Sequence, residues 1–133
     1  MDLEPAPDIE KIARHVLPTL PLPHIDVERI TFMRSYGATS RARARIWSFP
    51  RIWQLATGLS PRYVIEVLAH HFDHLSPDDK IRVVIHELMH IPKNFSGALV
   101  PHRGRHARID HRTVETLFQT FKKNSKSEYR NPK

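Results

Sequence analysis

The sequence predicts an α+β fold with a short three-stranded sheet packed on helices, and two patterns support this prediction. Residues 27–69 hold three segments rich in β-branched and aromatic residues, which are typical of strands. Segments with helical periodicity lie before and after them, at residues 8–20, 76–91 and 110–123. Because strands and helices are grouped along the chain, the order α-β-β-β-α-α is that of an α+β domain.

The length and composition are those of one globular domain. The chain has 133 residues, of which 40% are hydrophobic and 26% are charged. We expect a single domain over residues 1–133, with its core at 8–123 and a disordered tail at 124–133. No apolar run approaches the roughly 20 residues that cross a bilayer, and the N-terminus lacks the pattern of a signal peptide. We therefore expect a cytoplasmic protein without membrane contact.

Charge and residue usage narrow the chemistry. The chain has no cysteine, which excludes disulfides, cysteine nucleophiles and cysteine-ligated zinc sites. Its net charge of +7 predicts attraction to polyanions such as nucleic acid, although some small proteins are simply basic. Eight of its ten histidines are clustered, as a metal centre requires, although each histidine taken alone is more often a polar surface residue. These eight are His70, His71, His74, His86, His90, His102, His106 and His111.

The first helix is expected at residues 8–20, after a disordered segment at residues 1–7. Asp8 can be its N-cap, and a run of prolines follows its end. Its apolar face consists of Ile9, Ile12, Ala13, Val16 and Leu17.

Three strands are expected next, at residues 27–36, 41–49 and 62–69. In the second strand Arg41, Arg43 and Arg45 would share one face, either as a phosphate-binding strip or as an ordinary solvated face. Residues 50–60 between the second and third strands are expected to be irregular, with Trp53 and Leu55 packing inward.

The helix expected at residues 76–91 carries the strongest signal in the chain. Ser76 is a suitable N-cap, Pro77 fits the first helical position, and Asp79 completes a capping box. Pro92 ends the helix. The apolar face consists of Ile81, Val84, Ile85, Leu88 and Met89.

The opposite face of this helix carries the pattern H-E-x-x-H at residues 86–90. His86 and His90 are one turn apart, so both imidazoles can reach a single metal ion. Glu87 lies beside them and can accept a proton without being a ligand itself. A surface helix with two exposed histidines would give the same five letters, but the caps and the opposite apolar face favour a metal site.

A catalytic zinc site requires a third protein ligand. Residues 91–101 are long enough to turn back to the helix, with Gly97 as a flexible point, so His102 is the preferred candidate. His106 is the alternative, followed by Glu115, and His111 is a further candidate in the last helix. That helix, at residues 110–123, has Asp110 as its cap and a buried face of Val114, Leu117, Phe118 and Phe121.

Three stretches of the sequence resemble the small metallopeptidases of prokaryotes and their phages. They are HELMHIP, the preceding YVIEVLAHHFDHLSPDDK and the following FSGALVPH. These metallopeptidases are distant relatives of the SprT-like and other minimal zincins, and the resemblance covers roughly residues 25–121. It implies a zincin-like fold, with a short sheet, an active-site helix and a supporting helix. It also implies zinc ligands at His86, His90 and His102 and a catalytic base at Glu87. The cysteine-rich zinc ribbon that SprT-like proteins often carry is absent.

The leading hypothesis is a zinc-dependent peptidase with a peptide or protein substrate, Glu87 as general base, and His106 or His111 as an oxyanion donor. The substrate could add as a strand beside the helix, next to residues 62–69. One alternative is a zinc hydrolase that cuts RNA, although such enzymes carry H-G-x-x-H. A second is a basic nucleic-acid-associated protein with a structural metal site, and another divalent ion could replace zinc.

Overall fold

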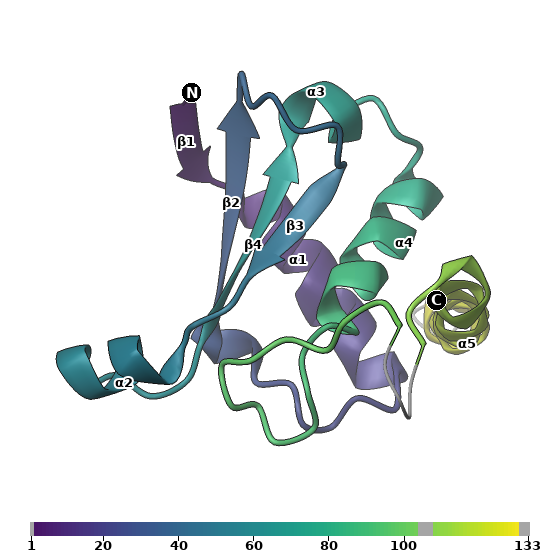
Figure 1. Cartoon of the computed structure of the whole chain (residues 1–133). Coiled ribbons are helices and arrows are strands. Elements are labelled where there is room, and N and C mark those ends of the chain that lie inside the picture. The colour runs from purple at the N-terminus through teal and green to yellow at the C-terminus, as the bar shows by residue number, and fades with distance from the viewer. Residues whose placement is uncertain (1, 104–107, 131–133) are drawn as a thin grey trace.

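A mixed four-stranded sheet forms the centre of the computed structural model, which describes residues 2–103 and 108–130, with side chains through Ser125. The predicted α+β class is confirmed, and Figure 1 shows α1 behind the sheet and α4 to the right of β3. The strands are β1 (Asp2–Pro5), β2 (Ile30–Tyr36), β3 (Ala44–Trp47) and β4 (Tyr63–Leu68). The helices are α1 (Pro7–Val16), α2 (Arg51–Thr57), α3 (Ala69–Phe72), α4 (Pro77–Leu88) and α5 (His111–Arg130), with short 3-10 turns at Leu17–Thr19 and Val27–Arg29.

The strand order is β1-β2-β4-β3. The central strands β2 and β4 are parallel, whereas β1 and β3 run antiparallel to them at the two edges. The sheet has one strand more than predicted, because Asp2–Pro5 pairs with β2 in place of the disorder expected at residues 1–7. All four side chains of β1 are exposed, so no apolar pattern in the sequence could mark this strand. Met1 lies outside the described residues.

Helix α1 begins one residue earlier than predicted, at Pro7, with Ala6 rather than Asp8 as its N-cap. Proline suits the first helical position because its fixed φ is helical and its missing N–H is not needed there. The Asp8 carboxylate instead accepts a hydrogen bond from the Arg34 guanidinium of β2 at 2.7 Å. This contact ties α1 to the sheet.

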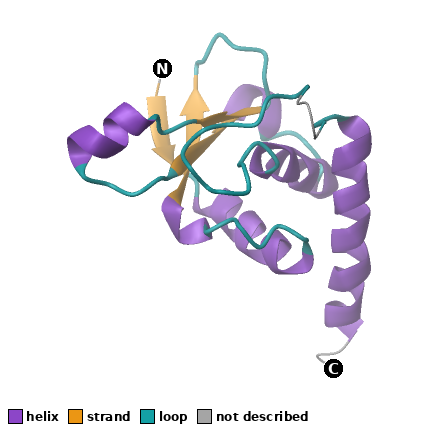
Figure 2. Ribbon diagram, turned by 60° about the horizontal axis from the view of Figure 1, so that its bottom comes forward, coloured by secondary structure: helices purple, strands orange, loops and turns teal. Residues whose placement is uncertain are grey.

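Helix α2 replaces the irregular segment predicted at residues 50–60. Gly58 ends it in the left-handed conformation at φ 73°, which glycine adopts readily. The prediction that Trp53 and Leu55 pack inward is wrong, since their side chains are 58% and 69% exposed. Figures 1 and 2 show α2 standing apart from the other helices.

Helix α4 lies between two hydrophobic cores, which explains its strong apolar signal. Val84 and Leu88 pack into the core formed with the sheet and α1. Ile85 packs into a second core with α5, where Ile81 and Met89 are partly buried. The predicted apolar face is thus confirmed, and it leaves the remaining side of α4 for polar residues.

Helix α5 begins after Asp110, whose carboxylate accepts a hydrogen bond from the Thr113 N–H at 3.0 Å, as expected for an N-cap. It continues to Arg130, beyond the end predicted at residue 123. Residues 131–133 lie outside the described part. Among the described residues, no helix has both the length and the apolar character to cross a membrane.

Candidate metal centre

Helix α4 and the turn that follows it supply His86, Glu87 and His90, the first three polar residues of the centre. The N-terminus of α4 is capped as predicted, with Ser76 Oγ accepting a hydrogen bond from the Asp79 N–H at 3.1 Å. The regular helix ends at Leu88, and a tighter turn follows, in which the His90 N–H donates to the Glu87 carbonyl at 3.1 Å. His90 therefore lies just beyond the helix instead of within it, still on the side of His86.

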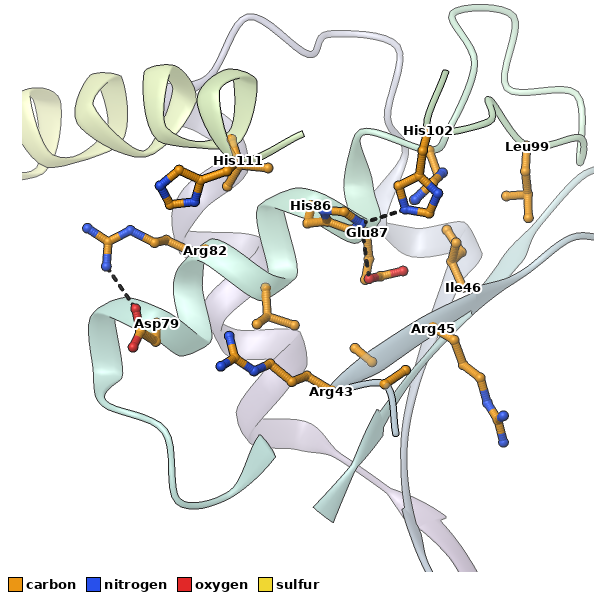
Figure 3. Close-up of a pocket in the computed structure, with 15 residues that line it drawn as sticks. Arg43, Arg45, Ile46, Asp79, Arg82, His86, Glu87, Leu99, His102 and His111 are labelled. Atoms are coloured by element: carbon orange, nitrogen blue, oxygen red, sulfur yellow. Dashed lines mark hydrogen bonds and ion pairs between the residues drawn. The ribbon is translucent and has the colours of Figure 1, made fainter. Parts of the chain in front are cut away.

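Three histidines meet beside α4, as Figure 3 shows for His86 and His102. One ring nitrogen from each of His86, His90 and His102 lies within 4.8 Å of the others. The Nε2 atoms of His86 and His102 are 3.1 Å apart. Three imidazole nitrogens converging in this way form a donor set that suits a zinc ion and leaves a fourth position open.

His102 reaches this position through a chain segment, residues 92–103, that returns along α4. The Val100 N–H donates to the His90 carbonyl at 2.7 Å, and the Ile109 N–H donates to the His102 carbonyl at 2.9 Å. His90 Nδ1 is 2.6 Å from the Val100 carbonyl oxygen. A proton on Nδ1 satisfies this contact and leaves Nε2 with a free lone pair, as a metal ligand requires.

Gly97 anchors the returning segment against the sheet. Its N–H donates to the Tyr63 hydroxyl at 2.9 Å, which in turn donates to the Ala98 carbonyl at 2.8 Å. The Gly97 carbonyl accepts from the Phe49 N–H at 2.7 Å. Gly97 has φ 94°, and a Cβ atom here would lie 2.3 Å from the Phe49 carbonyl oxygen. The residue expected to be a flexible point is thus a tightly fixed turn that requires glycine.

The protonation of the centre follows from its burial. Burial, followed by the neighbouring His90 and His102, lowers the pKa of His86 to about 4. Burial also lowers the pKa of His90 and raises that of Glu87 to about 7. The His86 and His90 imidazoles are therefore neutral at pH 7, the form that binds metals. The Glu87 side chain is nearly enclosed, with its Oε2 atom 3.9 Å from His86 Nε2.

The other candidate ligands lie elsewhere. The Glu115 carboxylate accepts a hydrogen bond from Arg82 at 2.9 Å, which ties α5 to α4. His111 lines the same cleft as the three histidines but is not part of their cluster. His106 lies outside the described residues.

The centre opens into a cleft of about 760 Å³ between α4 and the edge strand β3. The strand predicted at residues 62–69 cannot accept an added peptide strand, because β4 already pairs with β2 and β3. The edge strand next to the centre is β3, from the segment predicted at residues 41–49. Sequence reasoning missed this assignment, since the order of strands in a sheet depends on contacts between distant segments.

The predicted arginine strip does not form one face. Arg43 precedes the first residue of β3 and points toward α4, whereas Arg45 points away from the cleft (Figure 3). The Arg45 guanidinium donates to the buried Glu66 carboxylate at 2.8 and 3.2 Å, and the Trp47 indole donates to it at 2.8 Å. Arg45 thus fixes β3 to β4.

No curated protein and no solved structure significantly matches this chain. One family model does match, over residues 1–122, and its description is putative phage metallopeptidase. The match covers the sheet, the three histidines, Glu87 and most of α5, so it includes every element that forms the centre. This chain belongs to the family of putative phage metallopeptidases.

Proposed function

We propose that this protein is a zinc-dependent peptidase with a minimal zincin-like architecture. The observation that carries the proposal is the convergence of three imidazoles within 4.8 Å next to a nearly enclosed glutamate. The family supports a metallopeptidase, and a set of three imidazoles favours zinc over hard cations such as Mg²⁺, which prefer oxygen ligands.

His86, His90 and His102 would hold the metal. Bound there, zinc supplies a Lewis acid that makes a water molecule nucleophilic near neutral pH and polarises the scissile carbonyl. Glu87 accepts the proton of the attacking water and returns it to the leaving amine. His90 is oriented for its role by the Val100 carbonyl, which is 2.6 Å from its Nδ1 atom.

The substrate would bind as an extended peptide along β3. This strand has a partner on one side only among the described residues, and it lines the cleft that contains Glu87. Backbone hydrogen bonds to an edge strand would hold a peptide in an extended conformation with little dependence on its sequence. They would present the scissile bond to Glu87.

The test combines metal analysis with hydrolysis of unfolded protein and of a mixture of quenched peptides, with and without a chelator. We expect about one zinc per chain and an activity that the chelator removes and zinc restores. The variant Glu87→Gln should keep the metal and lose the activity, and His86→Ala should lose both. His74→Ala is the matched control, because His74 is exposed and lies outside the histidine cluster.

Two outcomes would overturn the proposal. Full activity in Glu87→Gln would remove the general base from the mechanism. Cleavage of RNA instead of peptides, assayed in parallel with the same variants, would make the protein a different kind of metal-dependent hydrolase.

A further inference from the structure

Arg43 is a charged residue of the cleft to which the proposed chemistry assigns no role. It lines the cleft immediately before β3 begins, at the end where Asp79 and Arg82 of α4 also line it. In Figure 3 its side chain extends toward α4, across the space that a peptide bound along β3 would occupy.

The other arginines of the cleft are already paired. Arg45 binds Glu66 at 2.8 Å on the far side of the sheet. Arg82 is shared between Asp79 and Glu115, each at 2.9 Å. Among the described residues, none forms an ion pair or a side-chain hydrogen bond with the Arg43 guanidinium. A fork of N–H donors is therefore open to a ligand at this end of the cleft.

The backbone of Arg43 is fixed, although its side chain is exposed. Its carbonyl oxygen accepts a hydrogen bond from the Leu68 N–H of β4 at 2.9 Å. The side chain thus starts from a defined point on the sheet, and only its own torsions need to be ordered when a ligand binds. A guanidinium held in this way suits a carboxylate, which it can bind with two parallel hydrogen bonds.

We propose that Arg43 is a specificity-determining residue that binds a carboxylate of the substrate, so that the protein prefers acidic peptides. This inference rests on the proposed peptidase function. Ile46, three positions after Arg43, lies near Glu87 in Figure 3. At the roughly 3.3 Å that each residue adds in a strand, the carboxylate would lie about 10 Å from the reacting carbonyl, within about three residues of the scissile bond.

The experiment compares the zinc-loaded wild type with Arg43→Gln and Arg43→Glu on quenched peptides that differ only by Glu, Gln or Lys near the scissile bond. We expect the wild type to cleave the Glu peptide with a kcat/KM about three- to tenfold above that of the Gln peptide, as for a partly exposed ion pair. Arg43→Gln should abolish this preference, and Arg43→Glu should invert it in favour of Lys. Peptides with a free or an amidated C-terminus distinguish a terminal carboxylate from a side chain.

Arg41→Glu is the matched control, because Arg41 is exposed, lies two residues away and does not line the cleft. It makes the same change in net charge, so an equal effect in both variants would show general attraction and overturn the role of Arg43. Equal cleavage of Glu and Gln peptides by the wild type would overturn this inference and leave the peptidase intact. No cleavage of any peptide would remove both. RNA binding that Arg43→Glu abolishes, without any peptide preference, would reassign Arg43 to phosphate.

Discussion

Helix α4 and the returning segment at residues 92–103 each carry part of the candidate metal centre, and they are held in place differently. The residues on α4 are positioned by the helical repeat, by an N-cap and by two hydrophobic cores. His102 lies outside the helices and strands, its carbonyl accepts a hydrogen bond from the Ile109 N–H, and its side chain is exposed. Two of the three proposed ligands are therefore locally determined, whereas the third depends on contacts with distant strands.

The largest expected effect is on zinc affinity, and it compares a ligand on α4 with the ligand on the returning segment. We expect both His86→Ala and His102→Ala to weaken zinc binding by more than the roughly 10- to 100-fold typical of losing an outer hydrogen-bond partner. The loss should be greater for His86→Ala, because His102 must be ordered from a more exposed position when it binds. Competition titration with a chromogenic chelator measures both affinities. An equal loss in the two variants would mean that the returning segment is as well ordered as the helix.

Gly97→Ala tests how tightly the returning segment is anchored. Its new Cβ would meet the Phe49 carbonyl oxygen at 2.3 Å, so we expect a loss of about 2 kcal/mol or more in the free energy of unfolding, together with weaker zinc binding. Gly58→Ala is the matched control, since its φ is 73° and nothing lies within 4 Å of the added Cβ. The Gly58→Ala variant should lose only about 1 kcal/mol in the free energy of unfolding. Urea denaturation of both variants makes the comparison, and equal losses would contradict the close packing at Gly97.

Tyr63→Phe removes the hydroxyl that joins Gly97 to Ala98, without touching the histidines. We expect a loss of about 1–3 kcal/mol in the free energy of unfolding, because two backbone groups lose their partner. Zinc affinity should fall by less than in the histidine variants. The control is Tyr36→Phe, whose hydroxyl donates to Glu4 at an exposed site and should matter by less than about 0.5 kcal/mol. Unchanged zinc affinity in Tyr63→Phe would show that the anchor does not position His102.

The smallest effect concerns β3, which ends two residues before Phe49, the hydrogen-bond partner of Gly97 in the returning segment. Burial acts to raise the pKa of Glu66, but the hydrogen bonds from Arg45 and Trp47 outweigh it and hold the pKa below its ordinary value of 4.5. Glu66 therefore stabilises the fold fully above pH 4.5, and this contribution is lost as the pH falls through the lower, folded pKa. The difference in unfolding free energy between wild type and Glu66→Gln should shrink as the pH falls below 4.5. A constant difference would contradict the lowered pKa.

The sequence predicted α4 well because its signals are local. The Ser76 cap, the apolar face with Val84, Ile85 and Leu88, and the placement of His86 beside Glu87 all follow from spacing within one helix. The position of His102 near them was expected from the length of the turn. The anchor at Gly97 was not, because Tyr63 lies 34 residues away along the chain.

Elements with exposed side chains escaped prediction for a different reason. Strand β1 is exposed at all four residues, and α2 buries none of its side chains, so neither carries the periodic burial that marks an element in sequence. The division of the arginines also depends on tertiary structure. The side chains of Arg43 and Arg45 point in different directions. Arg43 lies before β3, which begins at Ala44, whereas Arg45 lies within it and binds Glu66 on the opposite side of the sheet.

The two tryptophans give the molecule a built-in optical probe. The chain has only Trp47 and Trp53, in β3 and α2, and their side chains are 51% and 58% exposed. Intrinsic fluorescence excited at the indoles therefore reports on the strand that lines the cleft and on its neighbouring helix, and hardly on either core. A peptide that covers Trp47 will shift this emission to shorter wavelength and reveal binding without a label. Unfolding, by contrast, exposes little additional indole and is better followed by circular dichroism.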